Sequence, residues 1–135
     1  MSTFAEQIPS SLKTDTIYLC ERSIHSSFYV FSKLLKLSSE ESFMLKEIYN
    51  GYAKKISIKG IIFIHSSVEE CFKRAKDRNH LSDQCLSFEY MTEIHEKYME
   101  WFAQTDYPVF YVSDMMIKES SVDEIVAQAL EHFRL

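Results

Sequence analysis

Three short runs of apolar, β-forming residues, separated by segments with helical periodicity, constrain the fold of this chain most. The runs are Thr16–Cys20, Gly60–Ile64 and Pro108–Val112. Each run has the length of a strand and little polar alternation, which predicts buried strands. Strands joined by helical crossovers imply a parallel sheet with helices packed against it. The sequence therefore predicts an α/β fold with a short parallel sheet of about three strands.

Helical periodicity fills the interval between the first two runs. The first predicted helix spans Phe28–Leu37, and a second begins at Ser38, whose hydroxyl can cap it, and continues to about Lys54. The apolar side chains of this second helix repeat every four residues, at Met44, Ile48 and Tyr52. Both helices are apolar on one side, so they can cover a sheet face or pair with a second subunit.

Three further helices are predicted in the second half of the chain. Two of them open with a capping-box pattern, in which a serine precedes a glutamate by three residues: Ser67 with Glu70, and Ser121 with Glu124. A polar loop at 79–85 separates the first of these helices from another that begins near Ser87. His95 lies on the apolar side of that middle helix, where a core histidine is commoner than a ligand.

The chain has the size of one domain. Its 135 residues include 46% hydrophobic residues, enough to build a core. Residues 1–14 are polar and weakly patterned, which predicts an N-terminal arm, and residues 15–135 are expected to form the folded part. No apolar run approaches the ~20 residues of a membrane span. The N-terminus also lacks the apolar centre of a secretory signal, so we expect a cytoplasmic protein.

Charge and composition exclude several classes of function. The net charge of −5 leaves no basic footprint for a nucleic-acid partner. The three cysteines lack CxxC spacing, which fits a reducing compartment better than a disulfide framework: they are Cys20, Cys71 and Cys85. The five histidines are scattered, so a zinc site is not expected.

The two glycines, Gly51 and Gly60, exclude the common phosphate-binding loops. A GxxxxGK[ST] loop needs two glycines at a fixed, shorter spacing with a lysine after the second, and a GxGxxG fingerprint needs three glycines. Neither pattern occurs in this sequence. These residues therefore lack the glycine-rich backbone cradle that holds phosphate in many nucleotide-binding proteins.

Two charged pairs stand where they could contact an anionic ligand. Glu21 and Arg22 directly follow the first apolar run, and ligands of open α/β sheets bind at the carboxyl ends of strands. A local ion pair at the strand end is the alternative. Arg74 and Arg78 are four residues apart on one helical face beside the polar loop, which suits gripping a phosphate. The alternative is that both arginines only solvate a surface helix.

Four stretches resemble the C-terminal part of the deoxyribonucleoside kinases, in particular the thymidine kinase 2-like and deoxycytidine kinase-like group. They are Glu21–Ser26 (ERSIHS), similar to the ERS motif; Ile61–Cys71, similar to the strand and turn before the lid helix; Arg74 with Arg78, similar to the lid arginines; and Phe88-Glu89-Tyr90 with His95 and Trp101, similar to the helix after the lid. Their order and spacing agree from about Asp15 onward. The resemblance implies a partial P-loop-kinase-like, three-layer fold.

The resemblance implies a role for each matched position. Glu21 would help to hold Mg²⁺ near the triphosphate of ATP, and Arg22 would bind near the 5′-oxygen of a deoxynucleoside and the transferred phosphoryl group. Arg74 and Arg78 would close over the ATP phosphates, and Asp83 would bind the 3′-hydroxyl of the sugar. Such a set suits phosphoryl transfer, which needs positive charge and a metal ion more than covalent chemistry.

The sequence also departs from the pattern of this family. Ser27 stands beside the expected base site, where the group usually has an aspartate or a small residue, so base preference stays open. His80 stands where a third lid arginine is frequent, and Ser82 where an acid is common. The family's glycine-rich loop with its lysine, and the carboxylate that takes the 5′-hydroxyl proton, lie upstream of the ERS motif. We expect this chain to contain neither.

Two functions follow from these observations. In the first, the chain is the C-terminal part of a kinase that transfers the γ-phosphate of ATP to the 5′-hydroxyl of a deoxynucleoside in nucleotide salvage, and it needs an N-terminal half to be complete. In the second, it is a non-catalytic kinase-like module that binds a nucleoside or pairs with another subunit, including a second copy of itself. The first hypothesis is favoured by the charged residues that match the family pattern, and the second by the missing phosphate loop. The matching residues are Glu21, Arg22, Arg74, Arg78 and Asp83.

Overall fold

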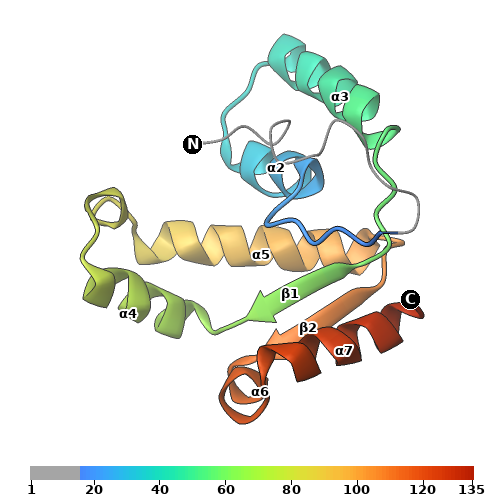
Figure 1. Cartoon of the computed structure of the whole chain (residues 1–135). Coiled ribbons are helices and arrows are strands. Elements are labelled where there is room, and N and C mark those ends of the chain that lie inside the picture. Colours follow the sequence, from blue (N-terminus) through green and yellow to red (C-terminus); the bar gives the residue numbers. More distant parts are fainter. Residues whose placement is uncertain (1–15) are drawn as a thin grey trace. The chain divides into compact units, whose positions relative to one another are not determined.

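The computed structural model describes residues 16–135, so the predicted N-terminal arm at 1–14 lies outside the described residues. The chain divides between Ile56 and Ser57 into two compact units. The described part of the N-terminal unit is helical, whereas the C-terminal unit combines helices with a sheet (Figure 1).

Three helices make up the described secondary structure of the N-terminal unit: α2 (Ile24–Tyr29), the short 3₁₀ helix η1 (Phe31–Leu34) and α3 (Ser39–Ala53). Helix α2 packs on α3 through aromatic rings. The ring of Phe28 stacks on that of Tyr49 with centroids 4.2 Å apart and planes at 10°. Aromatic stacking of this kind adds to the burial of apolar area, so these rings join the two helices.

The helix predicted over Phe28–Leu37 has the wrong bounds. Ser23 and Ser26 form a capping box that starts α2 ahead of the predicted position, and the helix ends at Tyr29. Leu35 lies outside both helices, with an extended backbone and an exposed side chain. The reason for the error is that serine occupies both capping positions here, whereas the sequence pattern that signals a capping box expects glutamate or glutamine at the second.

His25 is buried in α2, with an exposed fraction of 1%. The ring of Tyr49 lies edge-on to it, at a centroid distance of 5.5 Å. Burial lowers the pKa of His25 from its ordinary value of 6.5, because desolvation disfavours the charged imidazole. The unfolded chain then binds a proton more readily than the folded chain. The contribution of His25 to stability is therefore fully present above the unfolded pKa and is lost as the pH falls below it.

We expect the urea concentration at the midpoint of unfolding to decrease as the pH is lowered from about 7.5 to about 5. The decrease should be smaller in the His25→Phe variant, because phenylalanine takes up no proton. Denaturation curves at several pH values measure the effect. His80→Phe is the control, since His80 is exposed. An equal pH dependence in the wild type and in both variants would show that His25 makes no contribution.

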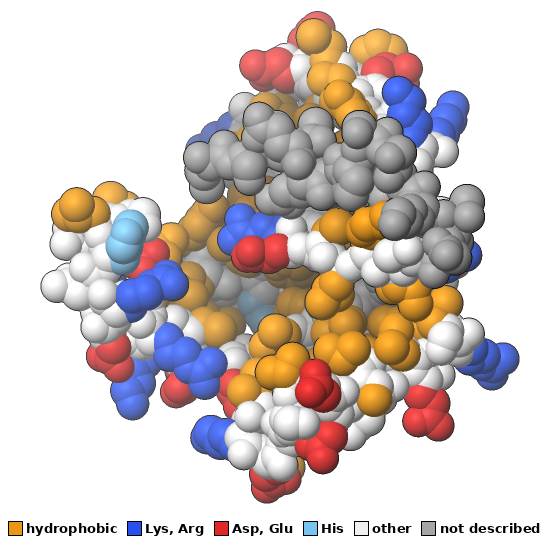
Figure 2. Space-filling model, in the orientation of Figure 1, with side chains coloured by type: hydrophobic (Ala, Val, Ile, Leu, Met, Phe, Trp, Pro, Cys, Tyr) orange, Lys and Arg blue, Asp and Glu red, His pale blue; other side chains and the backbone are white. Residues whose placement is uncertain are grey.

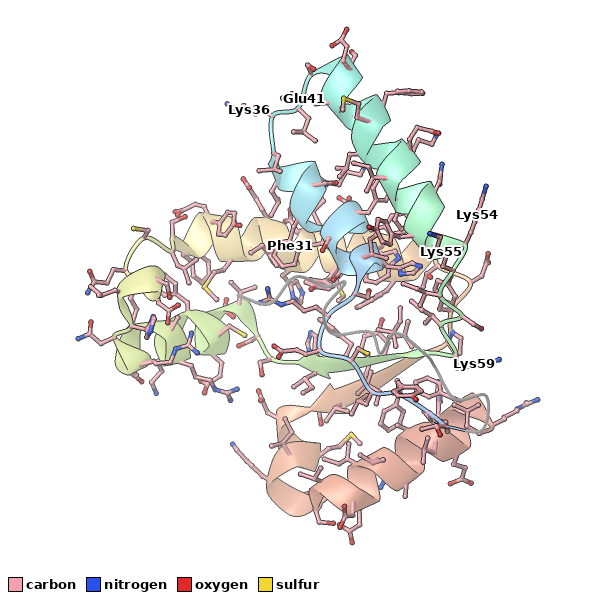
Figure 3. All side chains as sticks on the ribbon, turned by 45° about the horizontal axis from the view of Figure 1, so that its top comes forward. Phe31, Lys36, Glu41, Lys54, Lys55 and Lys59 are labelled. Atoms are coloured by element: carbon pink, nitrogen blue, oxygen red, sulfur yellow. The ribbon has the colours of Figure 1, made fainter. Side chains whose placement is uncertain are left out.

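Helix α3 begins and ends with side chains that suit its dipole. The hydroxyl of Ser38 accepts from the N–H of Glu41 at 3.2 Å, and the carboxylate of Glu41 accepts from the N–H of Ser38 at 2.8 Å, which completes a capping box. Figure 3 shows Glu41 at the start of the helix and Lys54 and Lys55 just after its end. Negative charge at the N-terminus and positive charge at the C-terminus stabilise a helix, so the predicted start of α3 is confirmed.

The predicted apolar stripe of α3 is exposed. Met44, Ile48 and Tyr52 have exposed fractions of 62%, 53% and 45%. A stripe of this kind on a helix is usually covered by a partner element or subunit. The side of α3 that packs within its own unit carries Tyr49 instead.

The C-terminal unit contains two strands and the remaining helices. Its elements are β1 (Ile61–His65), α4 (Val68–Arg78), the 3₁₀ helix η2 (Leu81–Asp83), α5 (Phe88–Gln104), β2 (Val109–Ser113), α6 (Asp114–Glu119) and α7 (Val122–Phe133). The strands pair in parallel, with Phe63 opposite Tyr111 and His65 opposite Ser113. The predicted parallel pairing of these two runs is confirmed.

The two faces of the sheet are covered by different helices. Phe63 on one face contacts Tyr98 and Phe102 of α5, at ring distances of 5.3 Å and 4.8 Å. Phe110 on the other face contacts His132 of α7 at 5.4 Å. Neighbouring residues of a strand point to opposite faces, so α5 and α7 lie on opposite sides of β1 and β2 (Figure 1). The C-terminal unit is thus a three-layer α/β/α unit, and the predicted fold class is confirmed.

The prediction of a strand at Thr16–Cys20 is wrong for the described structure. No strand is assigned to these residues, all five are exposed, and β1 and β2 pair with each other. The sheet therefore has two strands in residues 16–135, where about three were expected. A β-forming run becomes a strand only when neighbouring strands satisfy its backbone groups, and amino-acid preference does not supply those neighbours.

Two local features of the C-terminal unit differ from expectation. Helix α6 was not predicted; Ser113 caps it by accepting from the N–H of Met116 at 3.3 Å. At α4 only half of the predicted capping box forms, because Ser67 accepts from the N–H of Glu70 whereas the carboxylate of Glu70 turns to an arginine. The capping box predicted for α7 is confirmed.

Replacing each of the two glycines by alanine is expected to change the free energy of unfolding in opposite directions. A Cβ at Gly60 would overlap the ring of Phe133, whereas one at Gly51 in α3 meets nothing within 4 Å. We expect Gly60→Ala to lower the free energy of unfolding by about 1–3 kcal/mol through overpacking, and Gly51→Ala to raise it by about 0.5–1 kcal/mol through helix propensity. Urea denaturation of both variants tests this pair. A stable Gly60→Ala variant would mean that α7 does not pack over this position in solution.

Candidate functional site

The candidate site begins where the two parallel strands end. Ser66 directly follows β1 and Asp114 directly follows β2. Because His65 and Ser113 are paired, the residues after them also lie close together. The hydroxyl of Ser66 donates to Oδ1 of Asp114 at 2.7 Å. The carboxyl ends of parallel strands are the usual ligand-binding edge of open α/β sheets.

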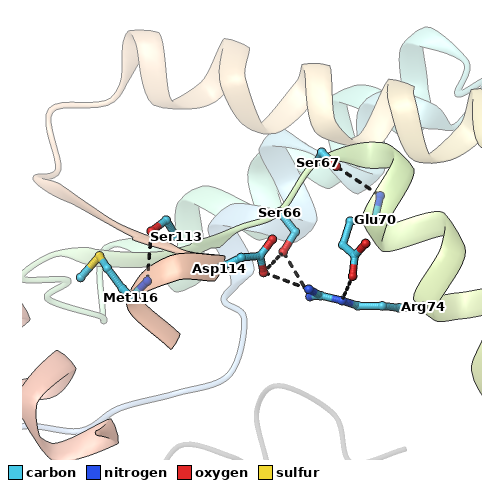
Figure 4. Close-up of polar contacts among 7 residues, drawn as sticks. All are labelled: Ser66, Ser67, Glu70, Arg74, Ser113, Asp114 and Met116. Atoms are coloured by element: carbon cyan, nitrogen blue, oxygen red, sulfur yellow. Dashed lines mark hydrogen bonds and ion pairs between the residues drawn. The ribbon is translucent and has the colours of Figure 1, made fainter. Parts of the chain in front are cut away.

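Helix α4 brings an arginine to these strand ends. The guanidinium of Arg74 contacts three side chains: its Nε donates to Oε1 of Glu70 at 2.9 Å, its Nη1 to Oγ of Ser66 at 3.3 Å, and its Nη2 to Oδ1 of Asp114 at 3.1 Å (Figure 4). We call Ser66, Glu70, Arg74 and Asp114 the strand-end cluster. Two carboxylates and one guanidinium give this cluster a formal charge of −1.

The contacts within the strand-end cluster stabilise the ionised forms of Asp114 and Arg74. The Ser66 hydroxyl and the Arg74 guanidinium lower the pKa of Asp114 below its ordinary value, and hydrogen bonds to Asp114 and Glu70 raise the pKa of Arg74. Asp114 therefore stays ionised at neutral pH, and its contact with Arg74 is lost only as the pH falls through the lowered value. Burial raises the pKa of the neighbouring Cys71 thiol, which keeps it protonated.

The second predicted arginine closes the loop after α4. Nε and Nη2 of Arg78 contact Oδ2 of Asp83 at 2.8 Å and 2.6 Å. Asp83 is 7% exposed, and its N–H donates to the carbonyl of His80 at 2.9 Å. Asn79 ends the helix with φ of 48°, a left-handed conformation that asparagine tolerates better than most residues. The chain thus turns sharply and places Asp83 against the helix that it has just left.

The two arginines of α4 contact different carboxylates. The side chains of Arg74 and Arg78 are 51% and 68% exposed, so solvent and ligands can reach both. Figure 2 shows Lys and Arg side chains gathered over α4, and the helix carries two lysines besides these arginines. The arrangement can bind an anion once a guanidinium leaves, or shares, its carboxylate.

We expect Asp83→Ala to open the loop at 79–87 and to lower the free energy of unfolding by about 1–2 kcal/mol, because it removes hydrogen bonds to a charged group. Asp83→Asn keeps an acceptor and should cost less. Hydrogen exchange of the loop amides and urea denaturation measure the two effects. Asp77→Ala, a change at an exposed residue of α4, is the control. Unchanged loop exchange in Asp83→Ala would show that the Arg78 contact does not hold the loop.

The ERS stretch lies in the N-terminal unit. Arg22 adopts φ of 61°, which few residues other than glycine take, and its guanidinium carbon lies 5.5 Å from the ring centroid of Phe31. Glu21 and Ser27 are exposed, and the hydroxyl of Ser27 donates to the carbonyl of Ser23 at 3.4 Å. Left-handed non-glycine residues gather at functional sites, so the backbone of Arg22 is consistent with a binding role.

The predicted site residues fall in both units. Within the C-terminal unit, Arg78 and Asp83 form an ion pair, and Glu21, Arg22 and Ser27 belong to the N-terminal unit. Ser66, Glu70 and Asp114 were not predicted from the sequence as partners of Arg74. Their signal was available in part, because Ser66 and Asp114 each follow an apolar run where parallel strands end together.

No group of three or more His, Cys, Asp or Glu side chains able to hold a metal ion occurs among residues 16–135. Magnesium in phosphoryl-transfer sites is held by one or two carboxylates together with substrate phosphates. The exposed carboxylate of Glu21 fits that kind of partial ligand set. In the same described part of the chain, no helix has the length and apolar character needed to cross a membrane.

Comparisons with known proteins agree with one another. A family model described as deoxynucleoside kinase matches residues 1–134. Mitochondrial deoxyguanosine kinase of Xenopus laevis is 25% identical over 117 residues, which cover 77% of this chain and 44% of that protein. The probable deoxycytidine kinase of Fowlpox virus is 28% identical over 100 residues, covering 70% of this chain and 43% of its own.

Human mitochondrial thymidine kinase 2 is 27% identical over 95 residues, which cover 66% of this chain and 36% of the human protein. The matched region therefore spans less than half the length of each of these three relatives.

Proposed function

This chain belongs to the deoxynucleoside kinase family, and we propose that it takes part in transferring the γ-phosphate of ATP to the 5′-hydroxyl of a deoxynucleoside. The reaction also needs a phosphate-binding loop, which the 135 residues do not include. Arg74 and Arg78 carry this proposal, since both are exposed cations of α4: Arg74 contacts Ser66 and Asp114 at the ends of the parallel strands, and Arg78 lies beside the loop after the helix. Guanidinium groups in such a place suit the charge that develops on a transferred phosphoryl group.

Each predicted site residue has a distinct task in this proposal. Arg74 and Arg78 bind the phosphates of ATP, and Arg22 binds near the 5′-oxygen. Asp83, released from its ion pair, accepts a hydrogen bond from the 3′-hydroxyl of the sugar, and Ser27 lies beside the base. Glu21 would hold Mg²⁺, which neutralises phosphate charge and bridges phosphate oxygens when bound.

The exposed stripe of Met44, Ile48 and Tyr52 supports a second candidate function, in which the chain is a non-catalytic module that binds a nucleoside or pairs with another subunit. In that case α3 supplies the pairing surface, including pairing with a second copy of this chain. Sedimentation of the wild type and of a Met44→Ser, Ile48→Ser variant helps to distinguish the kinase from the module. The module is favoured if the wild type associates, the variant does not, and calorimetry detects no binding of ATP to the chain.

Isothermal titration calorimetry with Mg-ATP, thymidine and deoxycytidine tests the main proposal. We expect Arg74→Ala and Arg78→Ala each to weaken ATP affinity by about tenfold, the effect of losing one charge-assisted contact. Lys73→Ala, at a neighbouring position on α4, is the control and should change the affinity little. Equal ATP affinity in all four proteins, the wild type included, would overturn the phosphate-binding role of the arginines.

A further inference from the structure

The strand-end cluster leaves Arg74 poorly placed to bind phosphate as it stands. A guanidinium binds phosphate best through two parallel N–H groups on one edge. The edge between Nη1 and Nη2 already faces Ser66 and Asp114, and Nε on the other side already donates to Glu70. Both edges therefore hold a protein acceptor. A phosphate must displace at least one of them, and it must also approach two carboxylates.

Asp114 is the more firmly held of the two carboxylates. It receives a hydrogen bond from the Ser66 hydroxyl at 2.7 Å, and its side chain is 31% exposed, compared with 41% for Glu70. Its position is also fixed by the paired ends of β1 and β2, because Ser66 and Asp114 each follow a paired residue. Arg74 is 51% exposed and lies on a long flexible stem. Exchange of partners therefore moves the arginine and leaves the aspartate in place.

We propose that Asp114, oriented by Ser66, is a positioning residue that competes with polyphosphate for Arg74 and holds this arginine at the strand ends until a polyphosphate displaces it. The inference rests on the proposed role of Arg74 in binding ATP and deepens it. Asp114 touches no reacting atom in this scheme, because it acts only through Arg74. The competition raises the concentration of polyphosphate needed to engage the arginine.

Calorimetric titration of the full chain with inorganic tripolyphosphate tests this proposal in a double-mutant cycle of Asp114→Asn and Arg74→Ala. We expect Asp114→Asn to lower the Kd by about fivefold when Arg74 is present, because one competing charge at the surface is removed. The same substitution should leave the Kd unchanged in the Arg74→Ala background. Asp114→Glu should restore the weaker affinity of the wild type. Glu119→Gln, at the far end of α6, is the control for a general loss of negative charge.

The possible outcomes separate this inference from the proposed function. A Kd that Arg74→Ala raises but Asp114→Asn leaves unchanged would overturn the competition alone. An equal gain from Asp114→Asn with and without Arg74, or from Glu119→Gln, would also overturn it, because the effect would be general electrostatics. Tripolyphosphate binding that is absent from every variant would overturn both this proposal and the phosphate-binding role of Arg74. Circular dichroism of each variant confirms that it is folded.

Discussion

The purified chain, incubated with Mg-ATP and thymidine or deoxycytidine, is expected to form no nucleoside monophosphate above a Glu21→Ala, Arg22→Ala control. The reason lies in its two glycines, whose spacing does not allow a GxxxxGK[ST] loop. Backbone N–H groups of such a loop hold the phosphates in line for transfer, and each such element contributes orders of magnitude to the rate. Direct detection of the monophosphate by chromatography measures the result.

The positive control is to add an N-terminal kinase segment that carries this loop and a carboxylate base. If the proposed function is right, the mixture should gain activity that Arg22→Ala removes. Product from the chain alone, above the double-alanine control, would show that these residues transfer phosphate without a glycine-rich cradle. That result would overturn our view of what the site lacks.

A large effect on stability is expected for Phe63→Ala, which should lower the free energy of unfolding by about 3 kcal/mol, the low end for a phenylalanine because this ring is only half-buried. Phe63 lies in β1 at the centre of an aromatic cluster and contacts four rings: His65, Tyr98, Phe102 and Tyr111. Its removal leaves a cavity between the sheet and α5 and forfeits several ring contacts. Urea denaturation followed by far-ultraviolet circular dichroism measures the change.

Phe43→Ala is the matched control, since Phe43 is 64% exposed on α3. Exposed substitutions usually change stability by no more than about 0.5 kcal/mol. Equal losses in the two variants would mean either that Phe43 is covered in solution by a partner or that Phe63 does not organise the core. Repeating the measurement at several protein concentrations separates these explanations, because only a partner copy makes the loss depend on concentration.

The family of the chain could be predicted from its sequence, because the ERS stretch and the two arginines of α4 are local patterns. So could most helices, since capping serines and apolar periodicity act within one or two turns. The start of α3 at Ser38 and that of α7 at Ser121 were predicted correctly for this reason. Helix α2 was mispredicted where the local pattern took an unusual form, with Ser26 in the place of glutamate.

Residue type alone determined that Gly60–Ile64 and Pro108–Val112 prefer the extended state, that α4 carries two arginines on one face, and that no glycine-rich loop can form. Only the tertiary structure decided that Thr16–Cys20 is no strand in the described residues and that Arg74 contacts Asp114, forty residues away. The physical reason is the same in both cases. Strand pairing and ion pairing depend on which groups from distant parts of the chain come within hydrogen-bonding distance. Composition, capping and periodicity describe only neighbours in sequence.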